Sequence, residues 1–126
     1  MDKLIKEVIE KVVHIAYDFY RVDKSELTLL KESGYFELHE QISENEIMEV
    51  LKNHPNLIAE WLQLSEDSRS SVRWGLSRND NGRYVIGHWP GGEGFEEISS
   101  TDKFYACAVF IKRHIESMRI LNSTSL

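Results

Sequence analysis

The sequence is poor in residues that crosslink small proteins, and it has no long apolar run. Its only cysteine, Cys107, excludes an intramolecular disulfide and any metal site built from several cysteines. No apolar segment approaches the roughly 20 residues that cross a bilayer. Charged residues recur through the first thirteen positions, so the N-terminus lacks the continuous apolar core of a signal peptide. We therefore expect a soluble, cytoplasmic protein that does not bind membranes.

Patterns typical of metal, nucleotide or nucleophilic chemistry are also missing. The five histidines lie far apart and form neither an HxxxH nor an HxH pair, so no metal site is predicted. The glycine-rich GGEG at 91–94 has no lysine after it and leads into a predicted strand, which favours a turn over a phosphate-binding loop. No GxSxG is present, and the best acid–base candidate is His88 near Glu93, with Tyr84 beside it. We predict no cofactor and no enzymatic activity.

The net charge of −6 is concentrated in the middle of the chain. Residues 35–67 carry eight acidic residues and one basic residue, Lys52. Such a surface repels nucleic acid and speeds association with basic partners, although a solvated surface kept charged for solubility has the same composition. The arginines near the predicted sheet are too sparse for nucleic-acid binding, and we expect them to pair with the acidic middle. They are Arg69, Arg73, Arg78 and Arg83.

Two helices are predicted before residue 35. Residues 3–20 repeat apolar side chains every three or four positions, which is typical of an amphipathic helix. Asp23 and Glu26 have the spacing of a capping box and predict a second helix that begins near Lys24. Gly34 is expected to end it, because glycine readily adopts the left-handed conformation that terminates helices. The sequence leaves open whether residues 1–32 form one kinked helix or two.

Three further helices are predicted downstream. Ser43 and Glu46 form a second capping-box pattern, which predicts a helix over 44–53, whereas 35–42 is either extended or a connection. Pro55 favours the start of another helix, and SEDSRSS at 65–71 is typical of a loop. The last helix follows a cap among residues 100–102, buries Cys107 and ends in the polar NSTS tail.

The stretch from Val72 to Trp89 predicts a β-hairpin, because two alternating arms flank the turn residues NDNG. Val72, Trp74 and Leu76 share one face of the first arm. The second arm is apolar on both faces, so it is either the central strand or covered by something else, such as a second copy in a homodimer. A short third strand is expected over 95–98. The whole chain, 1–126, is thus predicted to be one α+β domain, with N-terminal helices and one C-terminal helix packed on a small antiparallel sheet.

Trp89 precedes the glycine-rich segment PGGEGF. A tryptophan beside such a loop belongs either to the core, which we favour, or to an interface where it anchors a partner. In the core Trp89 would stabilise the fold, whereas at an interface it would contribute to partner binding.

The absence of a catalytic constellation favours a binding protein without chemistry of its own. Within this class, HPNLIAEWLQLSEDSRSS before the hairpin and YACAVFIKRHIESM at the end of the domain resemble small bacterial immunity proteins, which neutralise a cognate toxin. The resemblance implies a tight complex with a toxin domain, often a basic nuclease, whose active site is blocked. Charge and expected exposure give the predicted contact residues: Glu44, Glu46, Glu49, Glu60, Glu66, Asp67, Trp89 and Glu93.

The alternative is a small-molecule-binding or hydrolytic domain. Its pocket would lie between the sheet and the helices and be lined by Trp74, Tyr84, His88 and Trp89. An enzyme of this kind should place His88 within hydrogen-bond reach of a carboxylate inside a cleft, whereas a binding protein should show an exposed acidic or apolar surface.

Overall fold

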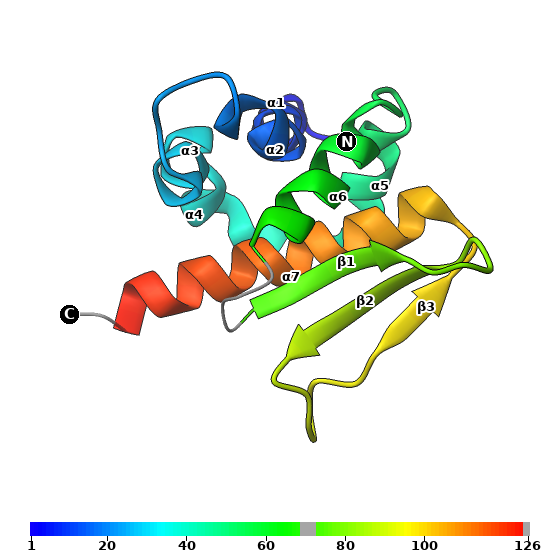
Figure 1. Cartoon of the computed structure of the whole chain (residues 1–126). Coiled ribbons are helices and arrows are strands. Elements are labelled where there is room, and N and C mark those ends of the chain that lie inside the picture. The colour runs from blue at the N-terminus through cyan, green and yellow to red at the C-terminus, as the bar shows by residue number, and fades with distance from the viewer. Residues whose placement is uncertain (69–72, 125–126) are drawn as a thin grey trace.

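The computed structural model describes residues 1–68 and 73–124, and within these ranges the predicted α+β fold is confirmed (Figure 1). Arg69 and Val72 lie outside the described residues. The helical elements are α1 (Lys3–Val13), α2 (Ile15–Phe19), α3 (Glu26–Ser33), α4 (Tyr35–Leu38), the 3-10 helix η1 (His39–Gln41), α5 (Glu44–Leu51), α6 (Leu57–Asp67) and α7 (Lys103–Thr124). The strands are β1 (Arg73–Arg78), β2 (Tyr84–Trp89) and β3 (Ile98–Ser100).

The predicted helix over 3–20 is divided at His14 into α1 and α2. The imidazole Nδ1 of His14 donates to the carbonyl oxygen of Glu10 at 2.6 Å. A side-chain donor that enters the backbone ladder in this way breaks the regular helix. Both segments still bury one apolar stripe, so the predicted amphipathic pattern is confirmed although the helix is not continuous.

The predicted cap of α3 is wrong, and its predicted end is confirmed. Ser25, rather than Asp23, is the N-cap, and its hydroxyl accepts from the Thr28 N–H at 3.1 Å. The helix ends at Gly34, whose φ of +90° is unfavourable for residues with a side chain. A Cβ at this position would also lie only 3.2 Å from Val8 Cγ2, so both the backbone conformation and the close contact favour glycine.

The middle of the chain is more helical than the sequence suggests. The segment 35–42 was expected to be extended or a connection, but its residues 35–41 form α4 and η1, and only Ile42 is extended. The capping box of Ser43 and Glu46 is confirmed, but α5 ends at Leu51, before the predicted residue 53. Helix α6 begins at Leu57 instead of Pro55 and continues to Asp67. The first three residues of the predicted loop at 65–71 are therefore helical.

The predicted hairpin is confirmed, and a third strand makes β2 the central one. In the turn, the side chain of Asn79 accepts from the backbone N–H groups of Asn81 and Arg83, each at 3.0 Å. Strand β3 begins at Ile98, where the predicted third strand was expected to end. Because β2 has a neighbour on each side, its apolar character matches the central position that the sequence left open.

One face of the sheet packs against α7. Trp74 and Leu76 of β1 and Ile86 of β2 are buried on this face. Helix α7 contacts all three strands and crosses behind the sheet in Figure 1. Its N-terminus is capped by Asp102, whose carboxylate accepts from the N–H groups of Phe104 and Tyr105. On the opposite face, α6 reaches only the β1 side, where a Cβ on Gly75 would lie 3.4 Å from the Ser65 hydroxyl, and Trp89 of β2 is exposed.

Helix α6 protects the outer edge of β1. The hydroxyl of Ser65 accepts from the backbone N–H of Leu76 at 2.7 Å, which replaces the strand partner that an edge lacks. Trp61, on the same helix, is fully buried, and its indole N–H donates to the carbonyl of Val13 at 2.9 Å. None of the helices in the described residues combines the length and the apolar character that crossing a membrane requires.

Candidate functional site

The face of the sheet opposite α7 carries the most exposed aromatic side chain among the described residues. Trp89, at the end of β2, is 68% exposed, so the favoured core position is wrong. We call this side of the sheet the open sheet face and define it by Gly75, Ser77, Val85, Gly87 and Trp89, which alternate with the residues that face α7. An aromatic ring of this size left in water is characteristic of interaction surfaces.

A pocket of about 380 Å³ opens on this face, and we call it the sheet pocket. Gly75 and Gly87 pair directly across β1 and β2, so no side chain rises between them. Glu66 of α6, Trp89 and Glu97 also line the pocket. The two glycines thus create the space, and the residues around them supply charge and an aromatic surface.

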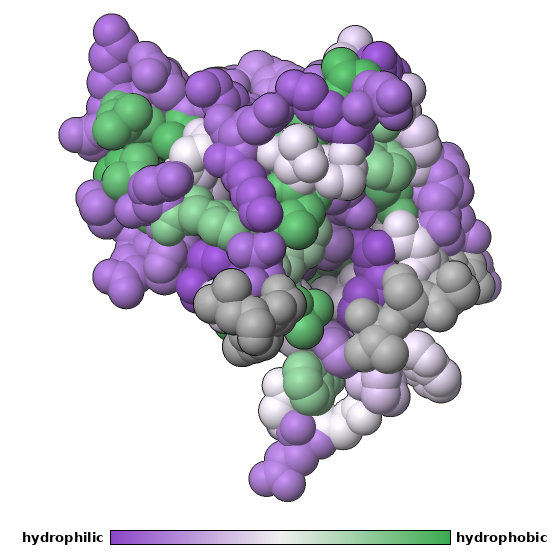
Figure 2. All heavy atoms as spheres, turned by 90° about the vertical axis from the view of Figure 1, so that its left-hand side faces the viewer, coloured by the Kyte–Doolittle hydropathy of each residue, from purple (hydrophilic) through white to green (hydrophobic). Residues whose placement is uncertain are grey.

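Glu97 is the charged group that lies over this floor. A Cβ built on Gly87 would be 3.8 Å from the Glu97 carboxylate oxygen Oε2. Glu97 is exposed and makes no hydrogen bond or ion pair with the described residues. Glu93 lies in the loop over residues 90–97, between β2 and β3. This loop is the lowest part of the molecule in Figure 1 and in Figure 2.

Arg73 also lines the pocket, but its charge is directed into the protein. Its Nη2 lies 3.3 Å from both ring nitrogens of His114, and the negative charge of Glu26 acts on the guanidinium. The buried His114 in turn donates from Nε2 to the Glu26 carboxylate at 2.6 Å. Burial disfavours the charged form of Glu26, but the hydrogen bond and charge of His114, with the charge of Arg73, lower its pKa overall. This cluster ties α3, α7 and β1 together.

His88 faces the other side of the sheet from Trp89. Its ring stacks on Phe95 with centroids 4.1 Å apart and meets Trp74 edge-on at 5.0 Å. Its Nδ1 donates to the carbonyl oxygen of Pro90 at 2.8 Å. Within the described residues no carboxylate hydrogen-bonds to His88, so the structure does not assemble the acid–base pair with Glu93. Tyr84 lies at the opposite end of β2 and does not line the sheet pocket.

The predicted contact residues on α6 have partners within the chain. Glu60 forms an ion pair with Arg21 at 3.1 Å. The Asp67 carboxylate accepts hydrogen bonds from the Tyr20 hydroxyl and, at 2.9 Å, from the Gln63 amide. Partial burial and the adjacent Asp67 raise the pKa of Tyr20 to about 12. These two acidic groups therefore hold α6 to its neighbours.

The predicted contact residues on α5 differ in their surroundings. Glu46 closes the capping box by accepting from the Ser43 N–H at 3.1 Å. Glu49 pairs with Lys52 at 3.2 Å, and both side chains are exposed. Glu44 is half-buried in the first turn of the helix. Of the eight predicted contact residues, only Glu66, Trp89 and Glu93 belong to the sheet pocket or to the loop beside it.

The arginines near the sheet were predicted to pair with the acidic residues of 35–67. The described contacts of Arg73, Arg78 and Arg83 include no such pair. Arg73 faces Glu26, which precedes that segment. Arg83 donates to the Ser99 carbonyl oxygen at 3.4 Å, and the Arg78 guanidinium lies 5.8 Å from the Tyr84 ring centroid. Within the acidic segment, Glu60 pairs instead with Arg21 in the turn after α2, and Glu49 pairs with Lys52.

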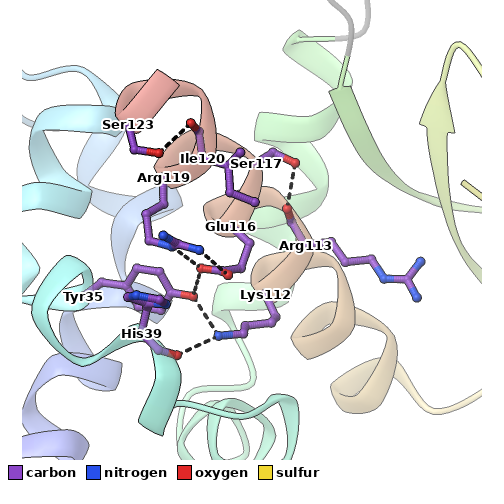
Figure 3. Close-up of polar contacts among 9 residues, drawn as sticks. All are labelled: Tyr35, His39, Lys112, Arg113, Glu116, Ser117, Arg119, Ile120 and Ser123. Atoms are coloured by element: carbon purple, nitrogen blue, oxygen red, sulfur yellow. Dashed lines mark hydrogen bonds and ion pairs between the residues drawn. The ribbon is translucent and has the colours of Figure 1, made fainter. Parts of the chain in front are cut away.

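A second polar cluster joins α4, η1 and α7 (Figure 3). The hydroxyl of the fully buried Tyr35 donates to Glu116 at 2.6 Å and accepts from Lys112 at 2.8 Å. Lys112 also donates to the His39 carbonyl at 3.1 Å, and Arg119 donates from Nε to Glu116 at 2.8 Å. Every charged group in this cluster has an opposite charge or a hydroxyl within hydrogen-bond distance.

The electrostatics of this cluster fit a structural role. Burial opposes the charged form of Glu116, but hydrogen bonds from Arg119 and Tyr35 and the charge of Lys112 outweigh it and lower the pKa to about 2. Burial and the Glu116 carboxylate raise the pKa of Tyr35. Arg113 points away from the cluster in Figure 3, and its guanidinium lies 4.6 Å from the Trp74 ring centroid.

Two of the five histidines come together in the fold. The rings of His14 and His54 lie 4.8 Å apart, and His54 Nε2 donates to the Glu10 carboxylate at 2.7 Å. Among the described residues no three His, Cys, Asp or Glu side chains are arranged to hold a metal ion. Cys107 is fully buried as predicted, and burial raises the pKa of its thiol, which suppresses the reactive thiolate.

Sequence reasoning missed the glycine pair and Glu97. The hairpin itself carried a signal for the glycines, because closing it around residues 79–83 places Gly75 opposite Gly87 and Arg73 opposite Trp89. No local pattern marks Glu97, which reaches the pocket only because β3 pairs with β2.

Comparison of the chain with models of protein families, with characterised proteins and with solved structures found no match.

Proposed function

We propose that this chain is a non-enzymatic binding protein that docks a basic protein partner against its open sheet face. The observation that carries the proposal is the 68% exposure of Trp89 beside the sheet pocket. A partner that covers this ring would remove a large apolar area from water, which makes it a candidate for the residue with the largest share of the binding energy.

The charge of the chain supports a basic partner. The net charge is −6, and Glu66 and Glu97 line the pocket around Trp89. Charges of one sign on a surface accelerate association with the opposite sign, even when the charged groups have partners within their own chain. We infer that Glu44, Glu46, Glu49, Glu60 and Asp67 contribute through this field, whereas Glu66, Trp89 and Glu93 make contact.

The resemblance to immunity proteins gives the partner a class. Under this proposal it is a toxin domain, often a basic nuclease, and binding blocks its active site. On the side of the molecule that Figure 2 shows, hydrophilic residues interrupt the hydrophobic patches. The described residues on that side therefore form no large continuous apolar surface of the kind that marks a docking site.

The test is affinity capture with the purified chain, followed by identification of the captured proteins and measurement of their affinity. We expect a basic protein that binds the unaltered chain, is lost with Trp89→Ala and dissociates more readily as salt is raised. Tyr105→Ala is the matched control, because Tyr105 is an exposed aromatic residue, 38%, at the start of α7. Equal capture by the two variants would contradict the proposal. Self-association that Trp89→Ala abolishes would replace the foreign partner with a second copy of the chain.

The small-molecule alternative retains one supporting observation. The sheet pocket has the volume of a ligand site, and Trp74, His88 and Trp89 line it. Native mass spectrometry of the chain purified from its source tests this alternative. A bound metabolite, together with no captured protein, would favour it over partner binding.

A further inference from the structure

The sheet pocket combines three features that suit one kind of side chain. Its floor is the Gly75 and Gly87 pair, the carboxylate of Glu97 lies over that floor without a partner among the described residues, and an exposed indole borders it. We propose that the pocket receives an arginine or lysine side chain of the protein partner, with Glu97 as its counter-charge and Trp89 as the surface on which it stacks. This inference rests on the proposed function and adds the group that is recognised.

The glycine floor provides the depth. Neither Gly75 nor Gly87 adopts a positive φ, so the backbone itself does not require glycine at these two positions. A Cβ on Gly87 would make only ordinary contacts, the nearest at 3.8 Å from Glu97. A Cβ on Gly75 would lie 3.4 Å from the Ser65 hydroxyl, so α6 borders the floor on that side. The fold therefore tolerates a side chain at Gly87, and the volume above Gly87 remains available to a partner.

Charge selects a cation for this space. Glu97 has no partner among the described residues, so its carboxylate can pair without breaking a contact within the chain. The positive charge of Arg73, which also lines the pocket, is already opposed by Glu26 on the far side of β1. The charged residues that line the pocket are thus Glu66, Glu97 and the neutralised Arg73, so the pocket is negative toward an incoming guanidinium or ammonium group.

Trp89 supplies the second half of the recognition. Cations bind over the face of an indole ring, and tryptophan is the strongest partner of this kind. Arginine has the better geometry, because its planar guanidinium can stack on the ring while its N–H groups face a carboxylate. On the opposite face of the sheet, the guanidinium of Arg113 already lies 4.6 Å from the ring centroid of Trp74.

The test is an NMR titration of the full chain with capped pentapeptides of glycine that carry one central residue. That residue is arginine, its neutral isostere citrulline, or glutamate. We expect the arginine peptide to shift the backbone amides of Gly75 and Gly87 and the indole N–H of Trp89. The citrulline peptide should bind about threefold to tenfold more weakly, since it keeps the shape and loses the charge.

Three variants locate the effect. Gly87→Ala fills the floor, Glu97→Gln removes the charge and Trp89→Ala removes the ring, and each should weaken the arginine peptide by about threefold or more. The matched controls are Gly91→Ala, in a loop that does not line the pocket, and Glu37→Gln, an exposed carboxylate on α4. Unchanged amide shifts of Val12 in α1 and Phe110 in α7, which are buried in the core, show that each variant keeps the fold.

The outcomes separate this inference from the proposed function. Equal shifts with arginine and citrulline, stronger shifts with glutamate, or no shift at the pocket would each overturn the cation site. Partner capture that depends on Trp89 would still stand in those cases. Loss of Trp89-dependent capture, with the arginine peptide still selective for the pocket, would instead contradict the proposed function and leave a cation site without that partner.

Discussion

The cluster around Tyr35 and Glu116 and the open sheet face both contain charged and aromatic groups, but they use them differently. In the cluster, each charged group pairs inside the chain, and Tyr35 is fully buried. On the open sheet face, Trp89 is exposed and Glu97 makes no contact with the described residues. Groups that are satisfied internally hold the fold together, whereas unsatisfied exposed groups are available for a partner.

The cluster of Glu26, His114 and Arg73 shares features with both regions. It is buried like the cluster around Tyr35, yet Arg73 reaches the sheet pocket. If the comparison holds, substitutions at buried pairs should cost stability, and substitutions on the open sheet face should leave stability nearly unchanged.

The largest loss of stability is expected for Glu26→Ala. The substitution leaves the buried His114 without its acceptor and the half-buried Arg73 without its opposite charge, so we expect a cost of about 3 kcal/mol. Urea unfolding measures it. The control is Glu32→Ala on the same helix, whose partner Lys24 is exposed and whose loss should cost less than about 1 kcal/mol. Similar losses for both variants would show that burial does not distinguish them.

The second expected effect is a dependence of stability on acid. The pKa of Glu116 in the folded chain lies at about 2, below its ordinary value of 4.5, so its ionised form stabilises the fold. This contribution is complete above about pH 4.5 and is lost as the pH falls toward about 2. Unfolding measured across this range should show a smaller decline for Glu116→Gln than for the unaltered chain. Parallel declines would assign the acid sensitivity to other groups.

A smaller loss, about 1 kcal/mol, is expected for Ser65→Ala. The substitution removes the hydroxyl that accepts from the Leu76 N–H at the edge of β1. Hydrogen exchange of that amide should accelerate together with the drop in urea stability. Ser77→Ala, at an exposed position of the same strand, is the control and should change neither quantity.

The smallest effects on stability are expected for Trp89→Ala and Glu97→Gln. Both side chains are exposed, so each variant should stay within about 0.5 kcal/mol of the unaltered chain in urea unfolding. The same two variants are expected to weaken binding, which separates function from folding on this face. A loss comparable to that of Glu26→Ala would mean that the open sheet face also serves the fold.

The sequence predicted well where local rules decide the structure. Ser43 and Glu46 form the predicted capping box, and Gly34 ends α3 with a positive φ. It predicted less well where several residues offer the same local signal. Ser25 replaced Asp23 as a cap because serine two positions later supplies an equivalent acceptor.

The candidate site was only partly predictable. Trp89 was recognised as informative, but its core position was favoured, because burial of a tryptophan depends on which elements cover it. Glu60 and Asp67 were chosen for their charge, and their pairing with Arg21 and Tyr20 depends on where α2 lies. Glu97 was missed because its sequence neighbours carry no pattern.

The sequence alone therefore determined the amphipathic helices other than α4 and η1, the hairpin, the buried Cys107 and the concentration of negative charge, since periodicity, turn residues and composition are local properties. Only the tertiary structure decided which charges are neutralised inside the chain and which remain on the surface. His114 meets Glu26 across 88 positions, and Tyr35 meets Glu116 across 81. Such pairs form because packing the helices on one face of the sheet brings distant segments together, and the same packing leaves the other face open around Trp89.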